Sequence, residues 1–200
     1  MKSETTKNLS LVIICIAFVA FVYGLIKAID IVDRTQIGTS KGTYTSYVTT
    51  SEEIKRQAFT LTKNCQSPLC IVQKLLDFAT NIPYQTKTFQ QKSPQKTIQE
   101  NFGDCDDKSN LLISMLHALD IEAYFVLVPK HIFVITSLES NLLVQRKGLW
   151  VNGKKYYILE STAKNSRVGY ALQYKLNDID VIIEPFSNKK IEINSLQYKL

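Results

Sequence analysis

The spacing of apolar and polar residues divides the chain into a hydrophobic run, a polar stretch and a long mixed segment. Positions 9–26 form an uncharged, almost wholly apolar run, long enough to cross most of a bilayer as a helix. Positions 30–50 are polar and rich in threonine, serine and glycine, which is typical of a tether. We therefore predict a short tail at 1–8, a transmembrane anchor at 9–27, a linker at 28–50 and one folded domain at 51–200.

A cleaved signal peptide and a buried helix are the alternatives for the apolar run. A signal peptide has a shorter apolar core followed by a small-x-small site, whereas the sequence here continues with YGLIK. An uncleaved anchor is therefore favoured. Lys2 and Lys7 precede the run while Lys27 and Arg34 follow it, so the flanking charges are nearly balanced. Because short N-terminal tails usually stay inside, we expect the domain outside the cytoplasm, in the periplasm if the cell is Gram-negative.

The first half of the domain has helical periodicity. Ser51, followed by two glutamates, is a good start for one helix, and Ser67-Pro68 is a good start for a second that ends near 81–83. The polar stretch 86–99 is predicted to be a surface loop. A third helix is expected over 105–119, with its leucines and Met115 on one side and Cys105 at the border of that apolar stripe.

The second half of the domain has the composition and spacing of strands. The runs rich in branched and aromatic residues are 121–128, 132–135, 141–144 and 155–159, with two shorter ones at 179–183 and 190–193. Helices followed by strands predict an α+β fold in which helices pack on an antiparallel sheet.

Composition and charge exclude some classes of function. The formal net charge is +6, but the basic residues are spread widely and do not interleave with aromatic residues, which argues against nucleic-acid binding. Cys65 and Cys70 form a short disulfide if the domain is exported, and stay thiols if it is not. Zinc is disfavoured because the CxxxxC spacing is poor and the chain has only two histidines. The expected partners are a protein or peptide substrate and, through residues 9–27, the membrane; no cofactor is expected.

Cys105 occupies a position that suits a reactive thiol. Gly103-Asp104 supplies a turn and a capping side chain, so Cys105 falls at the first position of the helix, where the helix dipole favours the thiolate. Asp106 and Asp107 follow at about 100° and 200° around the axis, so we expect both to project away from the sulfur. The alternative is that Cys105 is a small buried apolar residue.

A catalytic thiol needs a base, and only two histidines can supply one. His117 lies twelve residues further along the same helix, roughly 18 Å away by the axial rise, and is expected at the surface. His131 instead opens the strand HIFVI, after a turn that can bring it back to the helix start. Glu160 closes the strand KKYYILE and is the candidate to orient the imidazole.

Three segments, GDCDDKSNLLISMLHALDIEAYFVLV, HIFVI and YYILEST, resemble the transglutaminase-like superfamily of cysteine enzymes, which have a papain-like fold. They are also similar to the bacterial transglutaminase-like cysteine proteinases. The resemblance implies that Cys105 is the nucleophile, His131 the general base and acid, and Glu160 the orienting carboxylate. Two departures are a glutamate where aspartate is usual, and an interval before it that is lengthened by an extra hairpin over 140–153.

The same resemblance suggests calcium ligands beside the cysteine. Some of these proteinases bind calcium through flanking acids, which corresponds to Asp104 and Asp106 here. Two carboxylates fall short of the six to eight oxygens that calcium prefers, and helix capping is the competing role. Tyr84 and Gln85 are candidate donors to an oxyanion, although an ordinary surface role is the favoured alternative for both.

The sequence therefore predicts a membrane-anchored cysteine hydrolase, a peptidase or amidase that acts through a Cys-His-Glu triad and a thioester. A glutamine transamidase or deamidase and a catalytically inactive binding module are the alternatives. A redox protein that uses Cys65 and Cys70 is a further one.

Overall fold

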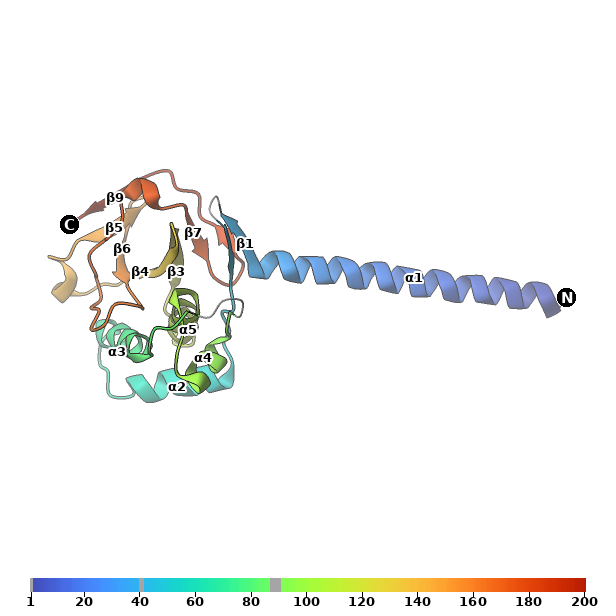
Figure 1. Ribbon diagram of the computed structural model, residues 1–200, viewed down its shortest axis with the longest axis horizontal. Coiled ribbons are helices and arrows are strands. Elements are labelled where there is room, and N and C mark those ends of the chain that lie inside the picture. The colour runs from blue at the N-terminus through green and yellow to red at the C-terminus, as the bar shows by residue number, and fades with distance from the viewer. Residues whose placement is uncertain (1, 40–41, 87–90) are drawn as a thin grey trace.

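One long helix projects from a folded body in the computed structural model, which describes residues 2–39, 42–86 and 91–200 (Figure 1). This helix, α1 (Lys2–Thr35), contains the stretch Asn8–Ile29, which is long and apolar enough to cross a membrane. None of its most apolar window is buried inside the protein. A buried core helix is therefore excluded, whereas a membrane span and a signal sequence both fit this observation.

Four helices form one layer of the body, and a hydroxyl or carboxylate caps the start of each. They are α2 (Glu52–Thr62), α3 (Pro68–Asn81), α4 (Pro94–Glu100) and α5 (Cys105–His117). The caps are Ser51, Ser67, Ser93 and Asp104, and proline follows the cap in α3 and α4. The prediction of a surface loop over the whole of 86–99 is wrong, because α4 begins at Pro94; residues 87–90 lie outside the described residues.

The second layer is a seven-stranded antiparallel sheet in the order β8–β7–β3–β4–β6–β5–β9. Its strands are β3 (Ala123–Val128), β4 (His131–Thr136), β5 (Gly148–Val151), β6 (Lys154–Leu159), β7 (Val181–Glu184), β8 (Lys189–Lys190) and β9 (Leu196–Lys199). The α+β prediction is confirmed. The predicted strand at 141–144 is wrong, since η1 (Asn141–Leu143) is a 3-10 turn there, and β5 and β9 were not predicted.

Helix α5 lies between the other helices and the sheet (Figure 1). All residues from Asp107 to Leu116 are buried, including the polar ones. Its apolar side joins the core formed with β3 and β4. A second hydrophobic cluster covers the opposite face of the sheet, where Tyr170, Leu172 and Tyr174 pack against it. That irregular segment precedes a second 3-10 turn, η2 (Leu176–Asp178).

The segment that joins α1 to the body packs against the body and is hydrogen-bonded to it. After the hairpin of β1 (Gln36–Thr39) and β2 (Gly42–Thr45), the Tyr44 ring is buried edge-on against Phe125, with 5.1 Å between ring centroids. The backbone N–H groups of Tyr47 and Thr49 donate to Asn110 Oδ1 (2.8 Å) and Ser114 Oγ (3.0 Å) on α5. Tyr44, Tyr47 and Thr49 all lie in the range 28–50 that the sequence predicts to be a linker, so the last part of that range packs against the body.

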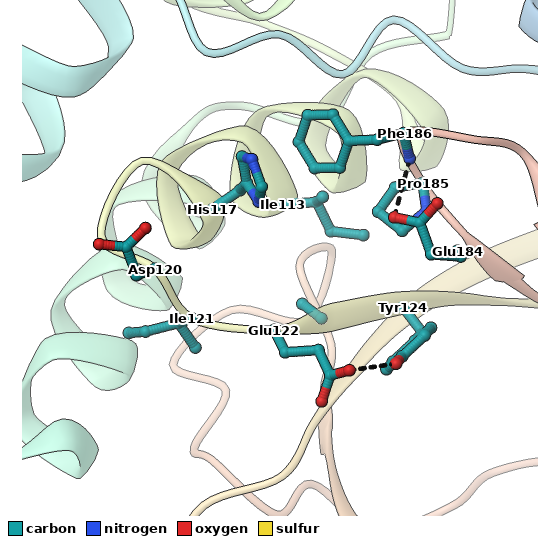
Figure 2. Close-up of a pocket in the computed structure, with 10 residues that line it drawn as sticks. Ile113, His117, Asp120, Ile121, Glu122, Tyr124, Glu184, Pro185 and Phe186 are labelled. Carbon is teal, nitrogen blue, oxygen red and sulfur yellow. Dashed lines mark hydrogen bonds between the residues drawn. The ribbon is translucent and has the colours of Figure 1, made fainter.

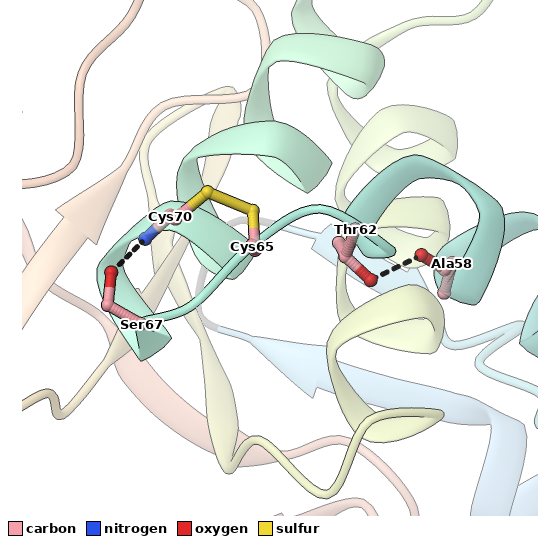
Figure 3. Close-up of a disulfide and its surroundings, with 5 residues drawn as sticks. All are labelled: Ala58, Thr62, Cys65, Ser67 and Cys70. Atoms are coloured by element: carbon pink, nitrogen blue, oxygen red, sulfur yellow. Dashed lines mark hydrogen bonds between the residues drawn. A yellow bond between two sulfur atoms is a disulfide. The ribbon is translucent and has the colours of Figure 1, made fainter.

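A disulfide joins Cys65 to Cys70 across the turn between α2 and α3 (Figure 3). Of the two states that the sequence allowed for this pair, the structure has the oxidised one. Ser67, inside the loop, accepts a hydrogen bond from the Cys70 N–H (3.3 Å). The crosslink therefore fixes the start of α3 relative to the end of α2.

Replacing both cysteines by serine is expected to lower the free energy of unfolding by roughly 2 kcal/mol, because the crosslink closes a loop of only about six residues in the unfolded chain. Urea denaturation of the full-length protein in detergent measures this loss. Wild-type protein treated with a reductant is the control and should match the double variant. Equal midpoints for all three samples would contradict the prediction.

Candidate active site

The nucleophile candidate Cys105 is the first residue of α5, and Asp104 caps that helix. The Asp104 Oδ1 accepts hydrogen bonds from the N–H groups of Asp106 and Asp107, both at 3.1 Å, and the Asp104 N–H donates to the Asp107 Oδ2 (3.4 Å). Gly103 precedes the cap because a Cβ there would lie 2.9 Å from the Asp107 Cβ. The predicted helix start and cap are confirmed.

Asp107 points away from the thiol, as expected, and is held by a buried lysine. The Lys92 N–H donates to the Asp107 Oδ1 (2.8 Å), and the Lys92 Nζ lies 3.8 Å from the Asp107 Oδ2. The same ammonium donates to the Phe102 carbonyl (2.6 Å) and lies 3.3 Å from the centroid of the Phe102 ring. This network ties the segment before α4 to the first turn of α5.

Asp106 does not point away from the thiol, so that part of the sequence prediction is wrong. The Cys105 thiol donates to the Asp106 Oδ1 at 3.4 Å. Burial, together with the charge of Asp104, raises the pKa of Asp106 to about 6. Burial, Asp106 and Asp104 also raise the pKa of the Cys105 thiol, and a hydrogen bond from the Ile132 N–H lowers it only partly. These neighbours therefore favour the protonated thiol, and the helix start alone does not make it a thiolate.

His131 and Glu160 are joined by a hydrogen bond of 2.9 Å between Nε2 and Oε2. His131 begins β4 and Glu160 directly follows β6, two strands that pair antiparallel, so both residues lie at the same edge of the sheet. The second carboxylate oxygen accepts from the Thr162 N–H (3.0 Å) and hydroxyl (2.6 Å). Burial raises the pKa of Glu160, but the hydrogen bonds from His131 and Thr162 outweigh burial and leave it below its usual range. Glu160 is thus a fixed carboxylate bound to Nε2 of the imidazole.

The sulfur lies at this same edge of the sheet. The Ile132 N–H that interacts with the Cys105 sulfur belongs to the residue next to His131. His131 is also close enough to Asp106 to lower its pKa. The structure therefore brings together Cys105, His131 and Glu160, the three residues singled out from the sequence.

Two tyrosines complete this site. Tyr174, from the irregular segment after β6, stacks on the His131 ring with 5.9 Å between centroids and 18° between planes. Burial and the charges of Glu160 and Cys105 raise its pKa. Tyr84 is 54% exposed, and burial and the charge of Cys105 raise its pKa too. Tyr174 was missed because no periodic pattern marks its segment, although it is one of few aromatic residues there.

A buried lysine, Lys108, holds the chain at the end of α3 that leads to the site. Lys108 has no exposed surface, and its Nζ donates to the Ile82 carbonyl (2.8 Å) and the Thr80 carbonyl (3.4 Å) at the end of α3. Burial lowers the pKa of Lys108 to about 8, opposed by the charge of Glu160. By holding the chain that leads from α3 to Tyr84, Lys108 places one wall of the site.

His117 is far from these groups, at the other end of α5. Its ring packs against Phe186, with 3.8 Å between centroids and 37° between planes, beside a cavity of about 310 Å³ that Ile113 and Tyr124 also line (Figure 2). The residue is exposed, as expected. It takes no part in the arrangement around Cys105.

Calcium at Asp104 and Asp106 finds no support in the donor set. Within the described residues, no group of three or more histidine, cysteine or acidic side chains could hold a metal ion. One Asp104 oxygen already accepts two N–H groups, and Asp106 accepts the thiol proton. These two carboxylates do not fit the ion.

The model of the transglutaminase-like superfamily matches residues 55–137. This segment carries a transglutaminase-like core. The match includes Cys105 and His131, while Glu160 lies beyond its end. The resemblance to the superfamily that the sequence motifs indicated is thus confirmed over this range, and the fold is transglutaminase-like.

Two solved structures are similar to the chain. One is a proposed cysteine protease from Cytophaga hutchinsonii, with 19% identity over 78% of this chain and 53% of that chain and a TM-score of 0.45. The other is a proposed protease from Parabacteroides distasonis ATCC 8503, with 16% identity over 70% of this chain and 27% of that chain and a TM-score of 0.45. The chain thus spans about half of the first and a quarter of the second. A search of curated proteins finds no significant match.

Proposed function

We propose that the transglutaminase-like domain is a cysteine hydrolase, a peptidase or amidase, in which Cys105, His131 and Glu160 form the triad. The observation that carries the proposal is the 2.9 Å hydrogen bond between His131 and Glu160 at the edge where the Cys105 sulfur lies. A carboxylate on Nε2 selects the tautomer in which Nδ1 accepts a proton. That is the arrangement a neutral thiol needs in order to become a nucleophile.

Proton transfer from Cys105 to His131 explains how a thiol with a raised pKa can react. The transfer creates an imidazolium that faces two carboxylates, Glu160 and Asp106. The acids that disfavour an isolated thiolate therefore stabilise the cation that forms with it. Tyr174 covers the imidazole and shields this ion pair from water, which strengthens it.

The reaction that follows from this ion pair is an acyl transfer. The thiolate attacks the substrate carbonyl carbon, and the Cys105 N–H, which has no acceptor within the helix, faces the developing oxyanion. His131 returns its proton to the leaving amine as the C–N bond breaks, which leaves a thioester on the sulfur. Water, deprotonated by His131, hydrolyses the thioester and releases the acid. An amine in place of water would give transamidation.

Alkylation by iodoacetamide tests the ion pair directly. In a Cys15→Ala background, Cys105 is the remaining free cysteine of the described residues. We expect His131→Ala to slow its alkylation at pH 7 at least tenfold, and Glu160→Gln to have an intermediate effect. The measurement is the alkylation rate from pH 5 to 9 by mass spectrometry. A profile that His131→Ala leaves unchanged would falsify the hydrolase proposal.

A binding module without catalysis is the second candidate. The observation that favours it is that burial and two neighbouring acids raise the pKa of Cys105. This candidate predicts slow alkylation in the wild type and no dependence on His131. The same experiment therefore separates the two functions.

We further propose that α1 anchors the domain on the extracytoplasmic side of a membrane. The Cys65–Cys70 disulfide supports this location, because such crosslinks persist in oxidising compartments. Alkaline phosphatase fused to the C-terminus is expected to be active in cells, whereas a fused green fluorescent protein exported by the same route stays dark. The reverse pattern would place the domain in the cytoplasm.

A further inference from the structure

A second candidate binding site lies away from the triad, between the start of α3, the η1 turn and the chain at 167–168. It is a cavity of about 460 Å³, and its lining includes Leu69, Leu143, Val168, Arg146 and Arg167. Leu143 and Val168 are buried and form an apolar floor. The two arginines are exposed. The cavity thus combines an apolar interior with cationic side chains.

The charged side chains that line this cavity are positive, although Arg167 also lines a neighbouring cavity together with Asp77. No acidic residue occurs among the described residues that line it. Within the described part of the chain, neither Arg146 nor Arg167 forms an ion pair. Lys147 and Lys164 stand close by in the sequence and add to the positive charge. Guanidinium groups bind carboxylates through paired hydrogen bonds, so the ligand that complements this cavity is anionic.

Exposed apolar side chains extend the surface beside the cavity. Leu142, which lines it, is 81% exposed, and Val144 is 59% exposed. A leucine and a valine next to two unpaired arginines are typical of a surface that a partner covers. The complementary ligand therefore has apolar side chains as well as carboxylates.

The walls of the cavity are fixed before any ligand binds. Gln73 on α3 donates to the Ser166 carbonyl (3.0 Å) and accepts from the Val168 N–H (3.0 Å), which holds the residues on both sides of Arg167. The Tyr157 hydroxyl donates to the Leu143 carbonyl (3.1 Å) and holds η1. The disulfide at Cys70 fixes the start of α3 (Figure 3). A site held in this way loses little conformational entropy on binding.

The position of the cavity favours a peptide over a lipid headgroup. Figure 1 shows α3 on the side of the body away from α1. With α1 in a membrane, this side faces away from the bilayer, so the anionic lipids of that membrane are out of reach.

We propose that this cavity binds a peptide segment of a partner protein that alternates acidic and apolar residues. Its carboxylates pair with Arg146 and Arg167, and one apolar side chain enters over Leu143 and Val168. The proposal does not depend on catalysis at Cys105.

Binding of a fluorescein-labelled (Glu-Leu)₄ peptide to the full-length protein in detergent micelles, followed by fluorescence anisotropy, tests the proposal. We expect saturable binding that weakens at least tenfold in the Arg146→Ala/Arg167→Ala variant and at high salt. Arg56→Ala, an exposed arginine on α2, is the matched control and should bind as the wild type does. (Glu-Ser)₄ should bind more weakly because it lacks apolar side chains, and (Lys-Leu)₄ should not bind.

The contrary results are equally definite. The absence of saturable binding up to about 1 mM peptide, or equal binding by the wild type and the double arginine variant, overturns the proposal. Anionic vesicles that bind the protein through these arginines while the peptide does not would assign the surface to lipid instead. Cys105→Ala should bind the peptide normally, so the outcome is separate from that of the hydrolase test.

Discussion

Replacing Cys105 by alanine is expected to abolish hydrolysis, with a loss of at least about a thousandfold in kcat/KM, because Cys105 is the one free cysteine among the described residues of the folded body. The side chain is small and only partly buried, so the melting temperature should change little. Turnover of a fluorogenic peptide library by the full-length protein, measured beside its thermal melting, separates loss of chemistry from loss of structure.

Cys15→Ala is the control for this variant, because it removes the other free cysteine and leaves the domain untouched. It should retain full activity. If Cys105→Ala keeps its activity within tenfold of the wild type, the nucleophile is a different group. The catalytic assignment of His131 and Glu160 then fails as well.

Replacing Lys108 by alanine is expected to cause the largest loss of stability, roughly 3–5 kcal/mol in the free energy of unfolding. The substitution empties a fully buried site and leaves the carbonyls of Thr80 and Ile82 without their donor. For a chain of this size, such a loss lowers the melting temperature by about 6–20 °C. Lys108→Met, which restores volume but no donor, should lie between the wild type and alanine.

The pH dependence of stability gives an independent check on Lys108. Burial lowers its pKa to about 8 in the folded protein, whereas an unfolded lysine titrates near 10.4. Between these values the unfolded chain binds more protons than the folded one, so stability rises with pH over that window. Urea midpoints from pH 7 to 10.5 should rise for the wild type relative to Lys108→Met. Parallel curves for the two proteins would refute the lowered pKa.

The candidate site was predictable where local chemistry determines it. Asp104 caps α5 and so fixes Cys105 at its first position, because an acceptor there satisfies free N–H groups wherever the helix lies. His131 was predicted to open one strand and Glu160 to close another, and the antiparallel pairing of β4 with β6 brings these two strand ends to a common edge. Each of these residues follows from a pattern a few residues long.

The parts that the sequence did not reveal depend on tertiary packing. An ideal helix directs Asp106 away from the sulfur, but at a helix start the side chain is free to turn back, and it does so. Lysine is a residue type usually found on the solvent-facing side of a helix, yet packing against α3 buries Lys108 completely. Tyr174 reaches His131 from an irregular segment without periodicity. For α4, in contrast, Ser93 followed by Pro94 was an available start signal.

The attachment of residues 44–49 to the body, through Phe125 on β3 and through α5, limits how far the domain can move from α1. A free polar tether would let the domain, and with it the thiol, occupy a wide range of positions relative to the membrane. Here only the hairpin at 36–45 separates the last turn of α1 from Tyr47 and Thr49, which are hydrogen-bonded to the body. With α1 embedded as proposed, the thiol works within roughly 40 Å of the lipid surface, about one domain diameter. Cleavable bonds would then be selected by their height above the bilayer as well as by their sequence.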